Sequence, residues 1–173
     1  MPMTKPAEPE QYLSFQLGAD VFACNILQVK EILEYHRLTG VPQMPAFVHG
    51  VMNLRGTVVP VIDLAQRCGR PASAILRRSC IVILEAGHEG QRQFIGMLVD
   101  AVHEVISLSA ADILPAPAFG NHLRPDFIAG VTHRQHGFIM LLHMDKVLSI
   151  EEMAGLSSPL GVQIKAESAC LMN

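Results

Sequence analysis

The sequence is poor in charge and in aromatic side chains. Only 17% of its 173 residues are charged, against roughly 25% in a typical soluble protein. Trp is absent and aromatic residues amount to 5%, whereas hydrophobic residues make up 50%. The apolar content is therefore aliphatic, and it is far too high for a disordered chain.

Other absences exclude further classes of protein. No uncharged apolar run approaches the roughly 18 residues that a membrane span needs. Residues 1–10 are polar and Pro-rich, without the apolar stretch of a secretory signal. The net charge is −3, and only Arg77 and Arg78 form a basic pair, which argues against nucleic-acid binding. We predict a cytoplasmic protein of one domain or two small barrels, without direct insertion into a membrane.

The four cysteines do not form a metal knuckle. Cys24, Cys68, Cys80 and Cys170 contain no CxxC pair. Without a secretory signal they are predicted to be reduced thiols. Cys24 and Cys80 lie in apolar segments and are predicted to be small core residues.

The eight histidines raise the possibility of a metal site or an enzyme. His133 and His136 form an HxxH pair with His143 nearby, but the pair straddles a hairpin turn at Gly137. No local carboxylate or cysteine completes a ligand set, and no nucleophile elbow or phosphate-binding loop is present. A Cys–His pair could still meet in space. We predict no catalytic residue, no metal and no cofactor, and keep a histidine-based metal protein or enzyme as the alternative.

Short apolar segments separated by turn residues run through the chain. Asp63 and Gly69 are suited to begin and end a short helix between them, and residues 79–85 are apolar enough for a strand buried on both faces. Many short, closely spaced strands favour barrels or a sandwich over a βαβ sheet. Strands are predicted at 12–18, 21–26, 29–35, 52–63 (a hairpin), 79–85, 94–99, 101–108, 127–132 and 138–143, with helices at 63–69 and 145–153.

Two pairs of segments indicate an internal duplication. Residues 22–32 match 95–105 in apolar pattern without a gap, and residues 47–51 match 127–131. The pairs occur in the same order, so each unit has roughly 70 residues, which is small for stable burial alone. We predict two packed units, with a groove at their interface. The hairpin after the second match is expected to carry about one extra residue.

Two apolar segments each carry a charge that could pair with the other. Glu31 lies in the segment 29–32 and Arg55 in the segment 53–56. A surface ion pair would be worth roughly 0.2–1 kcal/mol. If the pair is partly buried, removal of one partner could lower the stability by on the order of 3 kcal/mol or more. We predict that Glu31 and Arg55 pair beside a recognition surface.

At this point the sequence resembles the CheW family of chemotaxis coupling proteins. The NLRG segment with its flanking PAF and PVIDL sequences is quite specific to that family, and the resemblance covers about residues 11 to 153. The matching segments are 26–32, 45–56, 59–64, 96–100 with Val102 and Val105, 113–117 and 127–131.

The resemblance implies a mainly β fold of two intertwined five-stranded SH3-like barrels that share a hydrophobic core, with short helices. The expected divisions are a flexible tail at 1–10, a CheW-like domain at 11–153 and a C-terminal tail at 154–173. Within the domain, the first barrel is expected at roughly 22–70 and the second at roughly 79–145, with strand exchange from 11–18.

The resemblance also implies a function. CheW-like proteins are adaptors rather than enzymes. They couple the cytoplasmic tips of chemoreceptors to the CheA histidine kinase, through the CheW-like regulatory domain of that kinase, and further CheW copies can join rings. The protein would then be cytoplasmic and recruited to membrane-associated receptor arrays. Service in another chemosensory pathway, such as type IV pilus motility, is the alternative.

Site residues follow from the positions that match the family. The apolar excess left over by two small barrels is expected at their ends, so apolar patches are predicted at Val48, Val58 and Phe119. The linker at 69–78 departs from the family, because it carries Arg and Ala where members are often acidic or polar. The receptor-binding groove is expected to use Val29, Glu31, Gly50, Arg55, Val99, Val102 and Val105, and the kinase-binding surfaces Val48, His49 and Val58 with Phe119 at a second contact.

Overall fold

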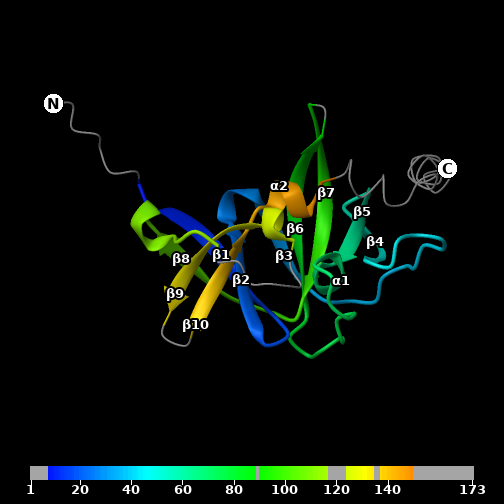
Figure 1. The fold of residues 1–173 in the computed structure, drawn as a ribbon. Coiled ribbons are helices and arrows are strands. Elements are labelled where there is room, and N and C mark those ends of the chain that lie inside the picture. Colours follow the sequence, from blue (N-terminus) through cyan, green and yellow to red (C-terminus); the bar gives the residue numbers. More distant parts are fainter. Residues whose placement is uncertain (1–7, 89, 117–123, 135–136, 150–173) are drawn as a thin grey trace.

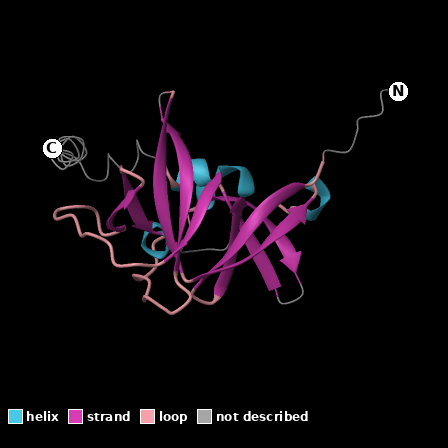
Figure 2. Cartoon of the chain, turned by 180° about the vertical axis from the view of Figure 1, so that it is seen from behind, coloured by secondary structure: helices cyan, strands magenta, loops and turns pink. Residues whose placement is uncertain are grey.

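The computed structural model describes residues 8–88, 90–116, 124–134 and 137–149. Strands dominate this part of the chain and its helices are short (Figure 2). The strands are β1 (Glu10–Leu17), β2 (Asp20–Asn25), β3 (Val29–Glu34), β4 (Val48–Leu54), β5 (Thr57–Asp63), β6 (Cys80–His88), β7 (Gln91–Val99), β8 (Ala101–Leu108), β9 (Ile128–Arg134) and β10 (Gly137–Leu142). The helices are α1 (Leu64–Arg67) and α2 (Met144–Val147), with 3-10 turns η1 (Ile26–Gln28), η2 (Ala110–Asp112) and η3 (Pro125–Phe127).

The strands form two five-stranded sheets that lie side by side (Figure 1). The sheet β8-β1-β2-β10-β9, called barrel A, is on the left in that view, and β3-β6-β7-β5-β4, called barrel B, is on the right. The mainly β fold with two five-stranded barrels is confirmed. The barrels divide the chain differently from the expected ranges, because β6 and β7 pair with β3 and β5, while β2 pairs with β1 and β10.

The division differs because each repeat is shared between the barrels. The first repeat runs from β1 to α1 and the second from β6 to α2. Barrel A contains the first two strands of repeat one and the last three of repeat two. Barrel B contains the last three strands of repeat one and the first two of repeat two. The chain changes barrel at η1, between β2 and β3, and at Asp100, between β7 and β8. Neither repeat can therefore complete a barrel alone.

The duplication is confirmed by the strand registers. In barrel A, Leu141 of β10 lies beside Ala23 of the parallel strand β2, and in barrel B Val61 of β5 lies beside Gly96 of β7. The expected extra residue in the second hairpin is wrong. The last paired residues are Leu54 and Thr57 in the first hairpin and Arg134 and Gly137 in the second, so the spacing is equal, because Gly137 begins β10 rather than forming the turn.

One apolar core serves both barrels. Strand β6 is buried on both faces as predicted: Val82 and Leu84 point into the shared core, whereas Ile81 and Ile83 point into barrel B. The alternation of side chains along a strand makes this double use possible. The shared core comprises buried residues of both barrels and both helices: Leu13, Phe15, Leu17, Phe22, Cys24, Ile62, Leu64, Ala65, Cys68, Val82, Leu84, Ala86, Ile95, Met97, Val99, Phe127, Leu142, Met144, Val147 and Leu148.

The predicted short helices are present. Asp63 caps α1 through a hydrogen bond that its side chain accepts from the Ala65 amide, and Gly69 follows with a φ of +81°. Helix α2 is centred earlier than the range 145–153, whose end lies outside the described residues, as do 1–7 and the tail 154–173. None of the helices found among the described residues is long and apolar enough to cross a membrane.

A buried arginine joins the two repeats. Arg67, at the end of α1, donates a hydrogen bond of 2.8 Å to the carbonyl of Val147, the equivalent residue of α2. Its guanidinium carbon lies 5.5 Å from the ring centre of Phe47 and 4.8 Å from that of Phe127, which occupy equivalent positions in the two repeats. Burial lowers the pKa of Arg67, and the nearby Arg124 adds to this effect. The two aromatic faces and the helix carbonyl compensate for lost hydration.

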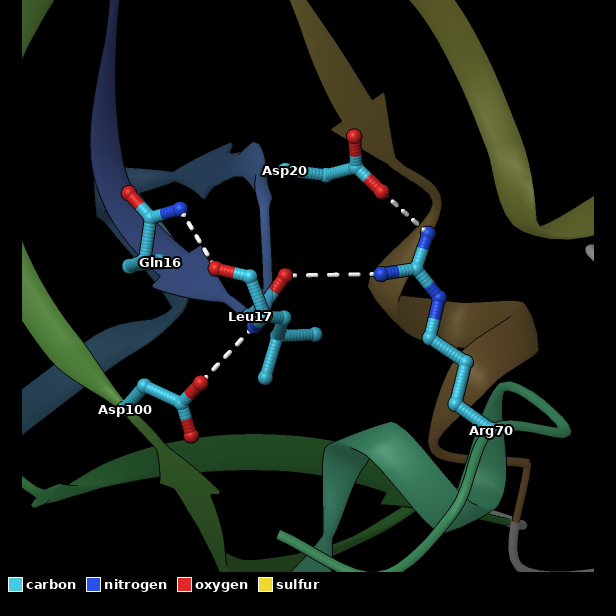
Figure 3. A network of polar contacts seen from close by, with 6 residues as sticks. Gln16, Leu17, Asp20, Arg70 and Asp100 are labelled. Carbon is cyan, nitrogen blue, oxygen red and sulfur yellow. Dashed lines mark hydrogen bonds and ion pairs between the residues drawn. The ribbon is translucent and has the colours of Figure 1, made fainter. Parts of the chain in front are cut away.

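A second polar network fastens the linker to barrel A (Figure 3). Arg70 follows α1 and contacts Asp20 at 2.6 Å and the Leu17 carbonyl at 3.4 Å. Asp100 approaches the same β1–β2 turn from the other side and accepts a hydrogen bond of 2.7 Å from the Gly18 amide. The start of the linker and one crossover are thus held at a single turn.

The tight packing inside barrel B yields a test. A Cβ atom on Gly96 would lie 2.8 Å from Val61 Cγ2 and 3.0 Å from Ile81 Cγ2. We expect Gly96→Ala to lower the free energy of unfolding by about 1–3 kcal/mol, because branched core side chains must move. Gly87→Ala, in β6 with open space around it, should change it by no more than about 0.5 kcal/mol. Urea titration measures both, and equal midpoints would contradict this packing.

Candidate partner-binding surface

The edge strands β3 and β8 carry matching apolar positions. Val29 of β3 and Val102 of β8 are equivalent in the two repeats, and both pack against the shared core while remaining partly exposed. Further along each strand, Ile32 is 42% exposed and Val105 is 49% exposed. We call Val29 with Ile32 the β3 stripe and Val102 with Val105 the β8 stripe.

Ile32 was not among the expected site residues. Its backbone lies opposite Val82 of the shared core, and that of Val105 lies opposite Leu13, so the two exposed residues face the same side of their sheets. The signal was present in the sequence, because the duplication aligns Ile32 with Val105. The tertiary structure adds that both positions lie on edge strands.

Glu31 and Arg55 form the predicted ion pair. The Arg55 Nη2 to Glu31 Oε1 distance is 3.0 Å. The Arg55 side chain is 78% exposed and that of Glu31 is 28% exposed, so the arginine lies at the surface and the carboxylate is partly buried. The pair connects β3 to the turn between β4 and β5, beside the β3 stripe.

The backbone at Arg55 is unusual for an arginine. Arg55 has a φ of +51° and Gly56 one of +87°, and the Gly56 amide donates a hydrogen bond to the Asn53 side chain. Two successive positive φ values define the turn that suits a two-residue hairpin, and they favour Gly, Asn or Asp. A long charged side chain is therefore held where the backbone disfavours it.

A second group of charges flanks β3. Glu85 of β6 contacts Lys30 at 2.8 Å and Arg92 at 3.3 Å. The hydrogen bond from Lys30 holds the pKa of the Glu85 carboxyl below its usual value. Lys30 is thereby directed toward β6, whereas Glu31 pairs with Arg55. Sequence reasoning missed Glu85, because only strand pairing brings it to β3.

The remaining expected groove residues are buried. Gly50 is buried where β4 meets Thr39, and a Cβ atom on it would lie 2.7 Å from the Thr39 carbonyl oxygen. This close approach permits the backbone bridge between Thr39 and Val51. Val99 is fully buried in the shared core, so it supports the surface and does not line it.

The expected kinase-side residues lie along the β4–β5 hairpin. Val48 is at one end, paired with Ile62, and Val58 is near the turn, paired with Asn53. His49 Nε2 lies 3.1 Å from the Tyr35 hydroxyl. Phe119 lies outside the described residues.

The apolar patches predicted at Val48 and Val58 are wrong, because both residues are half-buried. Large exposed apolar side chains in the described part of the chain lie elsewhere, at Leu27, Ile32, Ile75, Leu76, Phe94, Val105, Leu114 and Phe138.

The equivalent region of barrel A has different charges. Glu104 corresponds to Glu31, and it lines an open pocket of about 350 Å³ with His103, Arg134 and Phe138. Within the described residues no ion pair joins Glu104 to Arg134. The backbone is therefore duplicated, whereas the Glu31–Arg55 pair belongs to barrel B.

The described residues offer no cluster of three or more His, Cys, Asp or Glu side chains that could hold a metal ion. His136 lies outside them, and the ring of His133 packs edge-on against Phe138. Burial raises the pKa of Cys24 to about 12 and that of Cys68 to about 11, which disfavours their reactive thiolate forms.

Comparison with known proteins identifies the family. A family model described as the CheW-like domain matches residues 11–152. The chain belongs to the CheW-like family. It is 34% identical over 145 residues to the chemotaxis protein CheW of Klebsiella aerogenes, covering 84% of this chain and 85% of that protein. It is 33% identical to CheW of Rhizobium meliloti over 142 residues, covering 82% and 89% of the two chains.

A solved CheW structure supports the same family. The scaffolding protein TtCheW of Thermoanaerobacter tengcongensis matches with a TM-score of 0.70 and 31% identity, covering 80% of this chain and 92% of that one. A more distant match is the protein PilI of Pseudomonas aeruginosa, 28% identical over 134 residues, covering 74% of this chain and 70% of that protein. The matched relatives thus include proteins named for chemotaxis and a CheW protein described as a scaffold.

The Glu31–Arg55 pair can be measured by a double-mutant cycle. We expect Glu31→Ala and Arg55→Ala to show a coupling of about 0.2–1 kcal/mol in the free energy of unfolding, which shrinks in about 1 M NaCl. Ala shares the backbone cost of Arg at φ +51°, so the cycle isolates the side-chain pair. The control cycle of Glu31→Ala with Arg134→Ala should be additive. A coupling that persists in salt would show a buried pair instead.

Proposed function

We propose that this CheW-family chain is a non-enzymatic adaptor that couples chemoreceptors to the CheA histidine kinase. The observation that carries the proposal is the Glu31–Arg55 pair beside the β3 stripe, with Arg55 in a strained backbone position. Strain of this kind persists at binding sites, where the side chain is useful despite its cost.

The receptor partner suits the two apolar stripes. A chemoreceptor tip is a helical hairpin, and a helix presents apolar side chains at i, i+3 and i+4. Val29, Ile32, Val102 and Val105 offer partly exposed aliphatic contacts on strands that leave one edge unpaired among the described residues. Apolar anchors of this kind supply affinity, and the flanking Glu31–Arg55 pair sets orientation. Gly50 and Val99 support this surface from within.

The kinase partner is expected at the barrel ends. We propose that Val48, His49 and Val58 of the β4–β5 hairpin contact the CheW-like regulatory domain of CheA, with Phe119 at a second contact. Because these three residues are half-buried, the kinase domain would contact their backbone and their exposed edges and would not cover a free apolar patch. Two such contacts per chain would let CheA and further CheW copies alternate in rings, at arrays to which the cytoplasmic protein is recruited.

The match to PilI supports a second candidate of the same kind, a CheW-like adaptor of a type IV pilus pathway. The geometry of the β3 stripe serves either receptor. The set of partners that the chain binds discriminates between them.

A binding experiment tests the proposal. The purified chain is mixed with the regulatory domain of a CheA and with a receptor signalling fragment, both from the same organism, and binding is measured by calorimetry. We expect both partners to bind. Binding to neither would overturn the adaptor function, and selective binding to the components of a pilus pathway would favour the second candidate.

Because Arg55 has a strained backbone, its replacement should affect the stability of the protein and its binding to the receptor differently. We expect Arg55→Gly to leave the free energy of unfolding unchanged or to raise it by up to about 1 kcal/mol, because glycine accepts φ +51°. The same change should weaken receptor-fragment binding by about fivefold or more. Gln43→Gly is the matched control, since Gln43 has a φ of +63°, and it should leave binding intact. Wild-type affinity in Arg55→Gly would contradict the role of Arg55.

A further inference from the structure

The linker between the repeats presents a compact apolar and cationic turn. Ile75 is 46% exposed and Leu76 is 52% exposed, and the next residues, Arg77 and Arg78, are exposed as well. Within the described residues neither arginine has an ion-pair partner. Four successive exposed side chains of this composition are not needed to connect two strands.

The turn is held in place by hydrogen bonds. Ser73 donates from its amide and its hydroxyl to the two oxygens of the buried Asp63, at 2.8 Å each. The Leu76 amide donates to Ser79 Oγ at 2.8 Å, and the Ser79 amide donates to the Leu76 carbonyl at 3.1 Å. With Arg70 fastened to barrel A, the apolar and cationic side chains project from a fixed frame. A rigid frame reduces the entropy lost when a partner binds.

The turn continues the edge of barrel B that carries the β3 stripe. Glu34, the last residue of β3, pairs with Cys80 of β6, and the Tyr35 amide donates to the Ser79 carbonyl at 3.0 Å. Residues 76–79 therefore begin where β3 ends. The six residues of β3 span about 20 Å, so a helix along this edge makes between about three and four turns. Its next turn reaches the linker.

The positive charge of the turn indicates which side chains the next turn of the partner helix should carry. The chain has a net charge of −3, so a cationic site is a local inversion of its overall charge. Arg77 and Arg78 occupy the two central positions of the turn, and Glu34, at the end of β3, forms no ion pair with them among the described residues. Carboxylates are the natural partners of exposed guanidinium groups, and the adjacent aliphatic pair suits an apolar side chain one helical turn away.

We propose that residues 75–78 extend the receptor-binding surface and bind an acidic and apolar stretch of the same helical partner that contacts the β3 stripe. This inference rests on the proposed function. It adds a second contact to the site, with Ile75 and Leu76 as apolar contacts and Arg77 and Arg78 as the cationic ones.

The test compares two charge reversals of equal size. Arg77→Glu/Arg78→Glu removes the cations of the turn, and Arg134→Glu/Lys146→Glu makes the same change at exposed residues of the second repeat. Calorimetry with the receptor signalling fragment should show about tenfold weaker binding for the first variant and wild-type affinity for the second. The first variant should also lose part of the salt dependence between about 0.05 and 0.5 M NaCl. Ile75→Ser/Leu76→Ser should weaken binding without changing the salt dependence.

The outcomes separate this inference from the function on which it rests. If the wild-type chain and the Arg77→Glu/Arg78→Glu variant bind the receptor fragment with equal affinity, the linker contact is overturned and the adaptor function stands. Absence of binding by the wild-type chain would overturn both. Equal weakening in both charge-reversal variants would show a general effect of net charge and overturn the local contact. The local contact would also be overturned if the turn of the wild-type chain bound anionic lipid vesicles and not the receptor fragment. Thermal melting of each variant confirms that it is folded.

Discussion

The exchange of strands between the two repeats is the constraint on which the rest of the structure depends. Because the chain changes barrel at η1 and again at Asp100, each barrel is completed by strands of the other repeat. Strands such as β6 must then be apolar on both faces, one for its own barrel and one for the shared core. The same exchange leaves β3 and β8 at sheet edges, with Val29 and Val102 partly exposed beside that core. The exposed apolar positions of the candidate surface are thus a direct product of how the barrels are closed.

The two halves share a backbone plan but differ in charge. Arg67 and Val147 are equivalent residues, yet only one is charged, and its guanidinium lies between Phe47 and Phe127. Two arginines there would repel each other. Likewise the Glu31–Arg55 pair has no ion-paired counterpart at Glu104 in the described residues. A chain with few charges places several of them where the symmetry between repeats is broken, and a partner can therefore distinguish one barrel from the other.

Much of the fold followed from local rules. The alternating strands, the double-sided burial of residues 79–85 and the Asp63 cap depend on neighbours in sequence, and each is present. The duplication could be seen by matching segments along the chain, and it is present as well. The division into barrels was wrong, because similar apolar strands give no signal of which partner each one chooses. The hairpin length was wrong for a related reason: Gly137 looked like a turn residue, and only strand pairing placed it in β10. The apolar patches at Val48 and Val58 failed because burial of an aliphatic residue depends on which strands surround it.

For the candidate surface, the sequence determined the charges and the family, and the tertiary structure decided their setting. Glu31 and Arg55 could be paired from sequence since they are isolated charges in apolar segments. Their exposure, the positive φ at Arg55 and the salt link of Lys30 to Glu85 could not, because each depends on strand pairing across long separations in the chain. The exposed Ile32 and the turn at residues 75–78 belong to the same class. Sequence specifies which side chains are available, while burial and proximity arise only when nonlocal strands pair and exclude water from one face of each.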